Sequence, residues 1–451
     1  MKYFGTKSFL YVCIIDCAMR YRSTNGMAGD VSLAEAVGSC VAPDGGLYIP
    51  ARIPSLPKAF MKNIGDMSLR DIAYVVATSF FGDDISPATL KKIVDDAFAF
   101  DAPLIEVGKG MYVLELFHGP TLTVKDYGAR FMSRLMKYVL SPDVRRNIIV
   151  ATTGNTGAAV ANSFHNMENV NVFVLYPRGR LSRMDVAQFT SLSENVKPVE
   201  VSGSIEDCKR MMYDAIADPM LSACNLTGAN SINVGRLLPL AALGLHAYGR
   251  LLAADTADAS RAVYSVPCGN LSNLVGTVIA REMGLPSSGI VPACNVNSVL
   301  SKLLDGSFDG VISSPVPTFS PSMDMSYPSG WPRLEAVFAG CANVSRKDIL
   351  SSVAVTDREV SDVVNRLQAM GYSIDTHGAV AYAAASAIDT DVPKVVFGTG
   401  HPAKQLDIIT RITGRAVELP VQMTRFMAVK RQPYKIAPTL PALRKLILSF
   451  N

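Results

Sequence analysis

Three segments of the chain repeat one pattern: an apolar strand, a turn of small residues and the start of a helix. They cover residues 148–160, 263–274 and 395–404. Strands that alternate with helices along a chain are typical of parallel sheets covered by helices on both faces. In open sheets of this kind, ligands bind at the carboxyl ends of the strands, where such turns lie. The pattern therefore predicts an α/β fold in which several turns form one ligand site.

The first of these turns reads Thr-Thr-Gly-Asn-Thr-Gly over residues 152–157. Backbone N–H groups and hydroxyls at a helix N-terminus can bind an anion or a phenolate oxygen. The turn is no P-loop, because no Gly-Lys-Ser/Thr follows, and it lacks the glycine spacing of a dinucleotide-binding turn. A glycine-rich turn between strand and helix can also be purely structural, so its meaning depends on what lies near it.

Lys125 is the candidate reactive residue, since it lies among small polar residues and glycines in segment 118–131. A lysine that loses contact with water has a lowered pKa, and its amine becomes a usable nucleophile and base. That is what a covalent link to the aldehyde of pyridoxal phosphate requires. An unselected lysine is more often solvated at the surface. The three turns favour the reactive interpretation, because together with Lys125 they can surround one phosphorylated cofactor.

Several segments, in order along the chain, resemble the threonine synthase family in its longer bacterial and fungal form. The resemblance extends from about residue 19 to the C-terminal end, and its motifs are residues 42–50, 118–131, 152–157, 229–237, 268–273 and 398–404. It implies a pyridoxal-phosphate enzyme of fold-type II, similar to the tryptophan synthase β subunit. This fold has two open parallel-sheet α/β domains, and the family adds an N-terminal domain.

Domain boundaries follow from the motifs and from composition. We expect an N-terminal domain over 19–100, a large cofactor domain over 101–135 and 232–451, and a small α/β domain over 136–231. The apolar run in residues 1–18 is interrupted by Asp16 and is too short to span a bilayer. A signal peptide is an alternative, since Lys2 and Lys7 precede the run, but no convincing small-residue cleavage site follows it. We interpret residues 1–18 as a start-site extension, because a family-like start at Met19 follows immediately.

The resemblance implies a role for each cofactor residue. Lys125 would hold pyridoxal phosphate covalently and move protons between substrate carbons. Asn155 would donate to the ring oxygen, and Thr399 would face the pyridine nitrogen with a neutral hydroxyl. The cofactor phosphate would bind the backbone N–H groups of Gly269, Asn270, Leu271, Ser272 and Asn273.

Structural alternatives stay open for several of these residues. Asn155 could cap a helix that starts after Gly157, and Thr399 could cap one at His401. His118 fits a structural histidine, and Asp126 fits a charge at a helix N-terminus.

The resemblance also implies a second phosphate site, for the substrate. The planar guanidinium fork of Arg236 suits two phosphate oxygens, and neutral donors beside it would be Thr152, Thr156, Asn230 and Ser231. The alternative is a surface arginine beside a helix capped by Ser231.

A phosphate site besides that of the cofactor implies a phosphorylated amino acid as substrate. The family reaction converts O-phospho-L-homoserine and water to L-threonine and phosphate. Two alternatives are a phospho-lyase that releases 2-oxobutyrate from O-phosphohomoserine or O-phosphothreonine, and a non-catalytic cofactor-binding protein.

The chain departs from the family pattern at several places. Val124 stands where the family commonly has Phe before the lysine, Thr153 where it has Ser, and Cys-Gly-Asn-Leu-Ser over residues 268–272 where it has Ser-Gly-Asn-Phe-Gly. Ser272 replaces a glycine in the phosphate turn, where a positive φ would be strained. Pro-Ser-Met-Asp over residues 321–324 replaces Asn-Ala-Met-Asp. None of these changes removes a residue that the chemistry requires.

Composition excludes some other classes of protein. A net charge of +4 over 451 residues, without a dense basic tract, does not suggest nucleic-acid binding. The eight cysteines show no CxxC spacing, so we interpret them as reduced thiols rather than as a disulfide framework or a metal site. We expect a cytoplasmic monomer or homodimer that does not bind membranes.

Local patterns predict individual elements. Residues 170–175 and 199–201 are typical of strands, residues 313–332 of a loop, and residues 237–253 and 357–370 of helices. A helix should open after Ser204, with Asp207 completing a capping box.

Overall fold

The computed structural model describes residues 18–451 except positions 193, 298, 311–313, 350–351 and 428–430. The start-site extension therefore lies outside the described residues apart from Ala18. Within the described ranges, no helix is long and apolar enough to cross a membrane.

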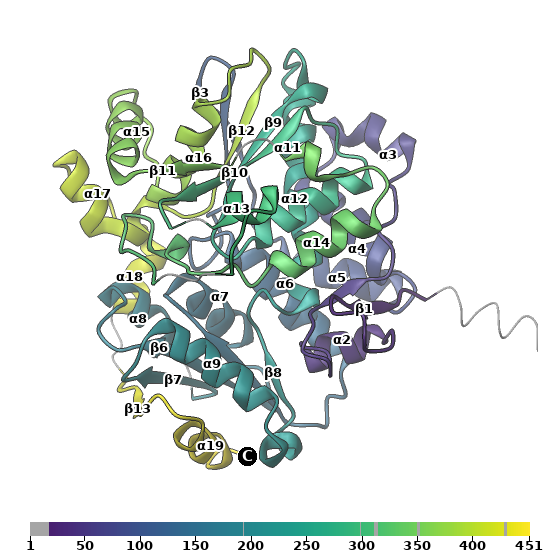
Figure 1. Ribbon diagram of the computed structural model, residues 1–451, viewed down its shortest axis with the longest axis vertical. Helices are drawn as coiled ribbons and strands as arrows, with labels where there is room; N and C mark the ends of the chain where they lie inside the picture. The colour runs from purple at the N-terminus through teal and green to yellow at the C-terminus, as the bar shows by residue number, and fades with distance from the viewer. Residues whose placement is uncertain (1–17, 193, 298, 311–313, 350–351, 428–430) are drawn as a thin grey trace, which may run out of the picture.

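The larger sheet lies in the upper part of Figure 1 and has the strand order β11-β10-β9-β12-β4-β3. All neighbours are parallel except β3 and β4, which form an antiparallel hairpin. The strands are β3 (Leu104–Gly108), β4 (Met111–Glu115), β9 (Val263–Pro267), β10 (Gly289–Asn295), β11 (Val353–Val355) and β12 (Lys394–Gly398).

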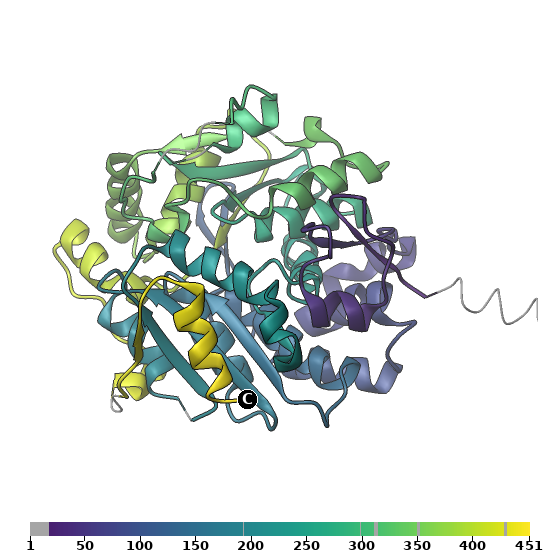
Figure 2. The same ribbon diagram turned by 60° about the horizontal axis from the view of Figure 1, so that its bottom comes forward.

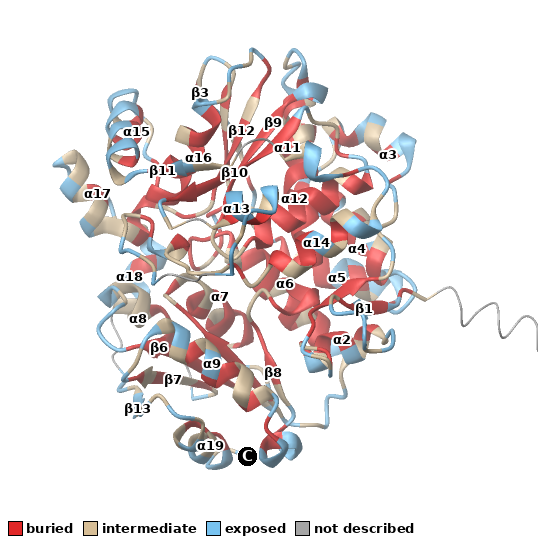
Figure 3. Ribbon diagram, viewed as in Figure 1, coloured by how far each residue is buried: buried red, intermediate tan, exposed pale blue. Residues whose placement is uncertain are grey.

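Successive side chains of a strand point to opposite faces of the sheet, so apolar strands leave two apolar faces. Helices cover both faces of this sheet. On β12, Val395 and Phe397 belong to the same core cluster as residues of α11 (Ala241–Ala253) and α12 (Ser272–Met283). Val396 belongs to the cluster that includes α16 (Thr376–Ser386). Figure 3 shows the strands and these helices buried at the centre, with more exposed helices around them.

The smaller sheet is wholly parallel, in the order β13-β7-β6-β5-β8. Its helices α7 and α8 pack on one face, and α9 and α19 pack on the other. The elements are β5 (Arg146–Ala151), α7 (Asn155–Phe164), β6 (Val170–Pro177), α8 (Arg183–Thr190), β7 (Val196–Val201), α9 (Ile205–Ile216), β8 (Leu226–Gly228), β13 (Tyr434–Ile436) and α19 (Leu440–Leu448).

The C-terminal segment corrects one predicted boundary. Strand β13 pairs with β7, and α19 packs against α9, as Figure 2 shows. Residues 434–451 thus lie with the small sheet, although the sequence placed them in the large domain. The reason is that the apolar residues Leu443 and Ile447 of α19 are buried in the core of the small domain. The other domain boundaries stay predictions.

The N-terminal residues form an antiparallel strand pair and a helical layer at the right of Figure 1. This layer packs on α6 (Lys125–Val139) and α11, and all three share one core cluster. Its elements are β1 (Tyr21–Ser23), α2 (Leu33–Ser39), β2 (Tyr48–Pro50), α3 (Lys58–Asn63), α4 (Leu69–Phe81) and α5 (Pro87–Ala97).

Several local predictions can be compared with the remaining elements. The capping box of Ser204 and Asp207 at the start of α9 is confirmed. The predicted helix over 237–253 is divided into α10 (Val234–Leu237), a 3-10 turn and α11, because Pro239 lacks a backbone N–H. The expected loop over 313–332, in its described part, contains a 3-10 turn, Pro321–Met323. The other helices are α13 (Leu300–Asp305), α14 (Trp331–Gly340), α15 (Asp357–Ala369), α17 (Leu406–Thr413) and α18 (Val421–Met427).

Candidate active site

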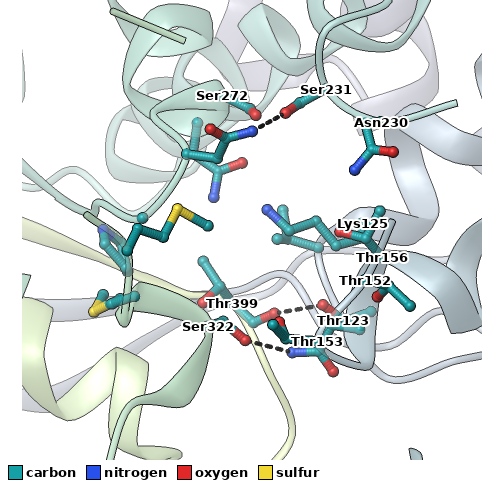
Figure 4. A pocket seen from close by; sticks show the side chains of 18 of the residues that line it. Thr123, Lys125, Thr152, Thr153, Thr156, Asn230, Ser231, Ser272, Ser322 and Thr399 are labelled. Carbon is teal, nitrogen blue, oxygen red and sulfur yellow. Dashed lines mark hydrogen bonds between the residues drawn. The ribbon is translucent and has the colours of Figure 1, made fainter. Parts of the chain in front are cut away.

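The turns after β5, β9 and β12 meet at one pocket between the two sheets (Figure 4). Each turn follows the carboxyl end of a parallel strand, as the sequence pattern predicts. The pocket brings together all but one of the predicted site residues: Lys125, Thr152, Asn155, Thr156, Asn230, Ser231, Arg236, Gly269, Asn270, Ser272, Asn273 and Thr399. The exception is Leu271, whose side chain is buried in the core.

Lys125 is the first residue of α6, and the preceding segment is fixed by the turn after β12. Thr123 and Gly400 form an antiparallel bridge, and the N–H of Val124 donates to the carbonyl of Thr399 over 2.9 Å. These contacts place the start of α6 at the pocket. Figure 4 shows the Lys125 amine directed into the open space.

Burial lowers the pKa of Lys125 to about 8, and the positive charge of Arg236 adds to this effect. The Lys125 amine makes no hydrogen bond or ion pair to any other described residue. A lysine amine with a pKa near neutrality is partly uncharged at physiological pH, so it can act as a nucleophile and as a base.

Arg236 lies beside this amine because α10 packs closely on α6. A Cβ on Gly128 would lie 2.5 Å from the carbonyl oxygen of Arg236, so only glycine permits this approach. Arg236 is buried, and burial lowers the pKa of its guanidinium to about 10. Its one hydrogen bond within the described chain is to the carbonyl of Ala229, over 2.8 Å. No described carboxylate forms an ion pair with it, so the guanidinium can accept an anionic ligand.

The turn after β5 is organised by Thr152. Its hydroxyl oxygen accepts from the N–H groups of Gly154 and Gly157, at 2.9 and 2.8 Å. The helix begins at Asn155, three residues earlier than the capping alternative assumed, and Gly154 is its N-cap. Asn155 therefore does not cap the helix. Its amide donates to the hydroxyl of Ser322 over 3.5 Å and lines the pocket.

The start of α12 presents unpartnered polar groups to the pocket. The Ser272 hydroxyl and the Asn273 side-chain carbonyl are buried and have no hydrogen-bond partner among the described residues. The first N–H groups of a helix also lack intrahelical partners. A Cβ on Gly269 would lie 2.5 Å from the carbonyl of Ser322, so the turn has no space for a side chain there. The Ser272 hydroxyl and the free N–H groups at this helix N-terminus are donors that suit a phosphate, whereas the Asn273 carbonyl can only accept.

The backbone strain expected at Ser272 lies one residue earlier. Leu271 adopts φ 61°, in the left-handed region, and Ser272 begins the helix. The serine that replaces a glycine is therefore not strained, and the prediction of strain at Ser272 is corrected. The Leu271 carbonyl accepts from Val275 as the N-cap of α12.

The neutral donors beside Arg236 are themselves held by hydrogen bonds. The Asn230 side chain accepts from the N–H of Ala151 and donates to its carbonyl, at 3.2 and 2.9 Å. The hydroxyl of Ser231 accepts from the Asn270 amide over 2.7 Å. The second amide N–H of Asn230 and the hydroxyl proton of Ser231 remain available for a ligand.

Thr399 is not a helix cap, because His401 has that role. His401 Nδ1 accepts from the N–H of Ala403 over 3.1 Å at the start of the 3-10 turn Pro402–Gln405. Thr399 lines the pocket from the turn after β12 (Figure 4).

His118 and Asp126 lie away from this chemistry. His118 is paired with Glu115 at 2.7 Å on the exposed side. Burial raises the pKa of Asp126 to about 6, and the carboxylate accepts from the Thr121 N–H and hydroxyl. Asp126 thus fixes the loop before Lys125.

Sequence reasoning missed several residues that line the pocket: Thr123, Thr153, Lys209, Ser322, Met323, Asp324, Met325 and His377. Thr123 and Thr153 lie inside motifs that the sequence had singled out, and residues 321–324 were noted only as a departure from the family pattern. Lys209, Met325 and His377 carry no local signal, because they reach the pocket through contacts between distant segments. Lys404 was noted only as the end of a motif. It is buried against Asp185 of α8, at 2.9 Å, directly behind the Gly154 turn.

Comparisons with known proteins agree with this geometry. The family described as "Threonine synthase N terminus" matches residues 20–98, and the family described as "Pyridoxal-phosphate dependent enzyme" matches residues 101–400. The chain is 32% identical to threonine synthase of Escherichia coli over 422 residues, which cover 93% of this chain and 97% of that protein. The chain belongs to the threonine synthase family.

Solved structures of the family have the same architecture. The crystal structure of threonine synthase from Escherichia coli is 31% identical, with a TM-score of 0.90 over 96% of this chain and all of that one. A pyridoxal-phosphate-bound threonine synthase from Brucella melitensis is 28% identical, with a TM-score of 0.84 over 95% of this chain and 99% of the other. The fold-type II architecture is therefore confirmed.

Pyridoxal phosphate is the cofactor of the family, and the residues present fit it. The pocket holds an unpaired amine with a lowered pKa and, at the start of α12, polar groups without partners. No group of three or more His, Cys, Asp or Glu residues in the described ranges could hold a metal ion.

Proposed function

We propose that the chain converts O-phospho-L-homoserine and water to L-threonine and phosphate. The observation that carries this proposal is the buried guanidinium of Arg236, which has no carboxylate partner in the described chain and lies next to the free amine of Lys125. A cofactor site alone needs only one phosphate-binding region, and the start of α12 supplies it. The second cationic site beside the reactive amine favours a substrate that brings its own phosphate.

Each neutral residue near Arg236 has a proton left to donate to that phosphate. Thr152 uses its oxygen to accept two backbone N–H groups, so its hydroxyl proton is free. Ser231 and Asn230 each keep one donor proton after their contacts with Asn270 and Ala151. Thr156 adds a hydroxyl from the first turn of α7. We assign these residues and Arg236 to the substrate phosphate, where the guanidinium offsets the charge of the leaving group.

The cofactor contacts are assigned on the same basis. The backbone N–H groups of the Gly269–Asn273 turn and the Ser272 hydroxyl bind the cofactor phosphate. Asn155 and Thr399 both line the pocket. Asn155 would donate its second amide N–H to the ring oxygen, and the Thr399 hydroxyl would face the pyridine nitrogen. Bound pyridoxal phosphate supplies an electron sink for the substrate carbons.

Lys125 is the proposed catalytic residue. With a pKa near 8, its amine can take a proton from one substrate carbon and return it to another without a large energetic cost. The reaction needs proton removal at the α and β carbons, loss of phosphate at the γ carbon and addition of water at the β carbon. The enclosed position of the amine keeps these transfers within the pocket.

Product analysis tests the proposal. Purified protein loaded with pyridoxal phosphate is incubated with O-phospho-L-homoserine, and amino acids and keto acids are quantified together with free phosphate. Threonine and phosphate in equal amounts support the proposal, whereas 2-oxobutyrate would identify a phospho-lyase. Absence of both products would contradict either activity.

The location and the assembly are proposed with the same function. We propose that the reaction takes place in the cytoplasm and that the working unit is a monomer or a homodimer. Sedimentation analysis of the loaded protein tests the assembly, and a trimer or larger species would contradict it.

A further inference from the structure

The segment Ser320–Asp324, called the covering segment below, forms one wall of the pocket and is anchored at both ends. The Ser320 hydroxyl donates to the carbonyl of Thr376 over 3.3 Å. At the other end, Asp324 accepts hydrogen bonds from the side chains of Asn295, Asn297 and Thr318, at 2.8, 2.9 and 2.7 Å. Pro321, Ser322, Met323 and Asp324 all line the pocket.

His377 holds the middle of this segment. It is buried in the first turn of α16, and its Nε2 accepts from the backbone N–H of Ser322 over 3.3 Å. Because Nε2 accepts, the ring proton is on Nδ1, which donates to Asp375 over 2.8 Å. Asp375 is itself fixed, since it also accepts from the N–H of Gly378 as the N-cap of α16.

Ser322 thereby contacts two predicted parts of the cofactor site, the phosphate turn at Gly269 and the Asn155 amide. Its carbonyl lies against Gly269 of the phosphate turn, so closely that a Cβ there would be at 2.5 Å. Its hydroxyl accepts from the amide of Asn155 over 3.5 Å, as the dashed line in Figure 4 shows. A displacement of Ser322 would move the Asn155 amide and uncover the glycine of the phosphate turn.

We propose that His377 is a positioning residue of the cofactor site, which acts by holding Ser322 between Asn155 and Gly269. This inference rests on the proposed role of Asn155 at the ring oxygen of pyridoxal phosphate. His377 does not touch the reacting atoms in this scheme. It fixes the backbone of the covering segment, and Ser322 in turn orients the Asn155 amide, whose second N–H would be left for the cofactor.

The test compares His377→Leu, which removes the acceptor, with His377→Gln, whose side-chain oxygen can accept from Ser322. Both are measured in the full chain by titration of the cofactor-free protein with pyridoxal phosphate and by the absorption maximum of the loaded protein. We expect His377→Leu to weaken binding about tenfold and to shift the maximum, because an oriented hydrogen bond to the ring oxygen is lost. His377→Gln should stay within about threefold of the wild type.

A folded His377→Leu protein with the affinity and the absorption maximum of the wild type would overturn the proposal. If His377→Leu does not fold, Ser322→Ala decides, since it removes only a hydroxyl. It should shift the absorption maximum while the melting temperature stays constant, and an unchanged spectrum would overturn the proposal. A wild-type protein that binds pyridoxal phosphate and forms no threonine would contradict the proposed function alone, because neither readout depends on the product.

Discussion

Arg236 and Arg333 are both buried and have no carboxylate partner in the described chain, but their surroundings differ. Arg333, on α14, donates to the backbone carbonyls of Tyr48, Ser231 and Ile232. All three of its nitrogen atoms are used, and it joins β2 to the segment before α10. Arg236 has one carbonyl partner and otherwise faces the pocket.

The difference shows how the two buried arginines can have different roles. A buried donor with all its partners supplied by the chain stabilises the fold, and a ligand could only disturb it. A buried donor without partners costs free energy in the empty protein and recovers it when a ligand arrives. Among the residues that line the pocket, Lys125, Arg236 and Ser272 have groups without partners among the residues described and can bind a ligand. Lys404, Arg333 and Ser265 have partners within the chain and stabilise the structure around the pocket.

The largest effect is expected from Lys125→Ala, which removes the unpaired amine. Turnover of O-phospho-L-homoserine should fall by about 10⁴-fold or more, because no other described residue supplies an amine without a partner at that position. The melting temperature should not fall, since a desolvated charge is removed. Activity within tenfold of the wild type would contradict the assignment of Lys125.

Substitution of Arg236 should lower activity, whereas substitution of Arg333 should lower stability. Arg236→Met should lower kcat/KM by about 10³-fold through the loss of a bidentate phosphate contact, with the stability unchanged within about 1 kcal/mol. Arg333→Met, the matched control, should cost about 3 kcal/mol in urea unfolding, because three buried carbonyls lose their donor. Its folded fraction should keep most of its activity. The opposite pattern would invalidate the comparison.

The lowered pKa of Lys125 predicts how cofactor capture depends on pH. Only the neutral amine reacts, so the rate should rise about 50-fold from pH 6 to pH 8 and only about twofold above that. The measurement is stopped-flow absorbance of the cofactor-free protein mixed with pyridoxal phosphate. N-α-acetyl-lysine in the same buffers is the control, and its rate should still be rising near pH 10. A protein profile that follows this control would show a solvated lysine.

The smallest effect on cofactor binding is expected from Ser272→Ala, and Ser265→Ala is its control. Ser272→Ala should weaken pyridoxal phosphate binding about threefold, since one neutral donor is lost while the backbone N–H groups remain. Ser265 donates to the carbonyl of Ala381 over 2.7 Å, so Ser265→Ala should cost about 1 kcal/mol of stability and leave cofactor affinity unchanged. Equal effects of both changes on affinity would remove the distinction between them.

The elements found from sequence are those specified by local pattern. The turns after β5 and β9 and the capping box of Ser204 depend on neighbouring residues, so apolar runs, glycines and caps were sufficient. Such signals set which turns face the pocket. They do not set which distant segments complete it.

The residues that sequence reasoning missed depend on long-range contacts. His377 meets Ser322 across 55 positions of the chain, and nothing in either local pattern indicates that contact. Pro239 is a local signal that the predicted helix is divided, but the apolar run around it favoured one continuous helix. Strand β13 has mostly exposed side chains, so hydrophobic pattern could not assign it to the small sheet.

The return of β13 to the small sheet has a consequence for synthesis of the protein. While the polypeptide is being translated, β7 is an open edge until residues 434–436 have left the ribosome, and an open edge can pair with another strand. By then the nascent chain already contains Lys125, Arg236 and the turns proposed to bind the phosphates. Closure of the sheet therefore comes after every described residue of the candidate pocket has been made.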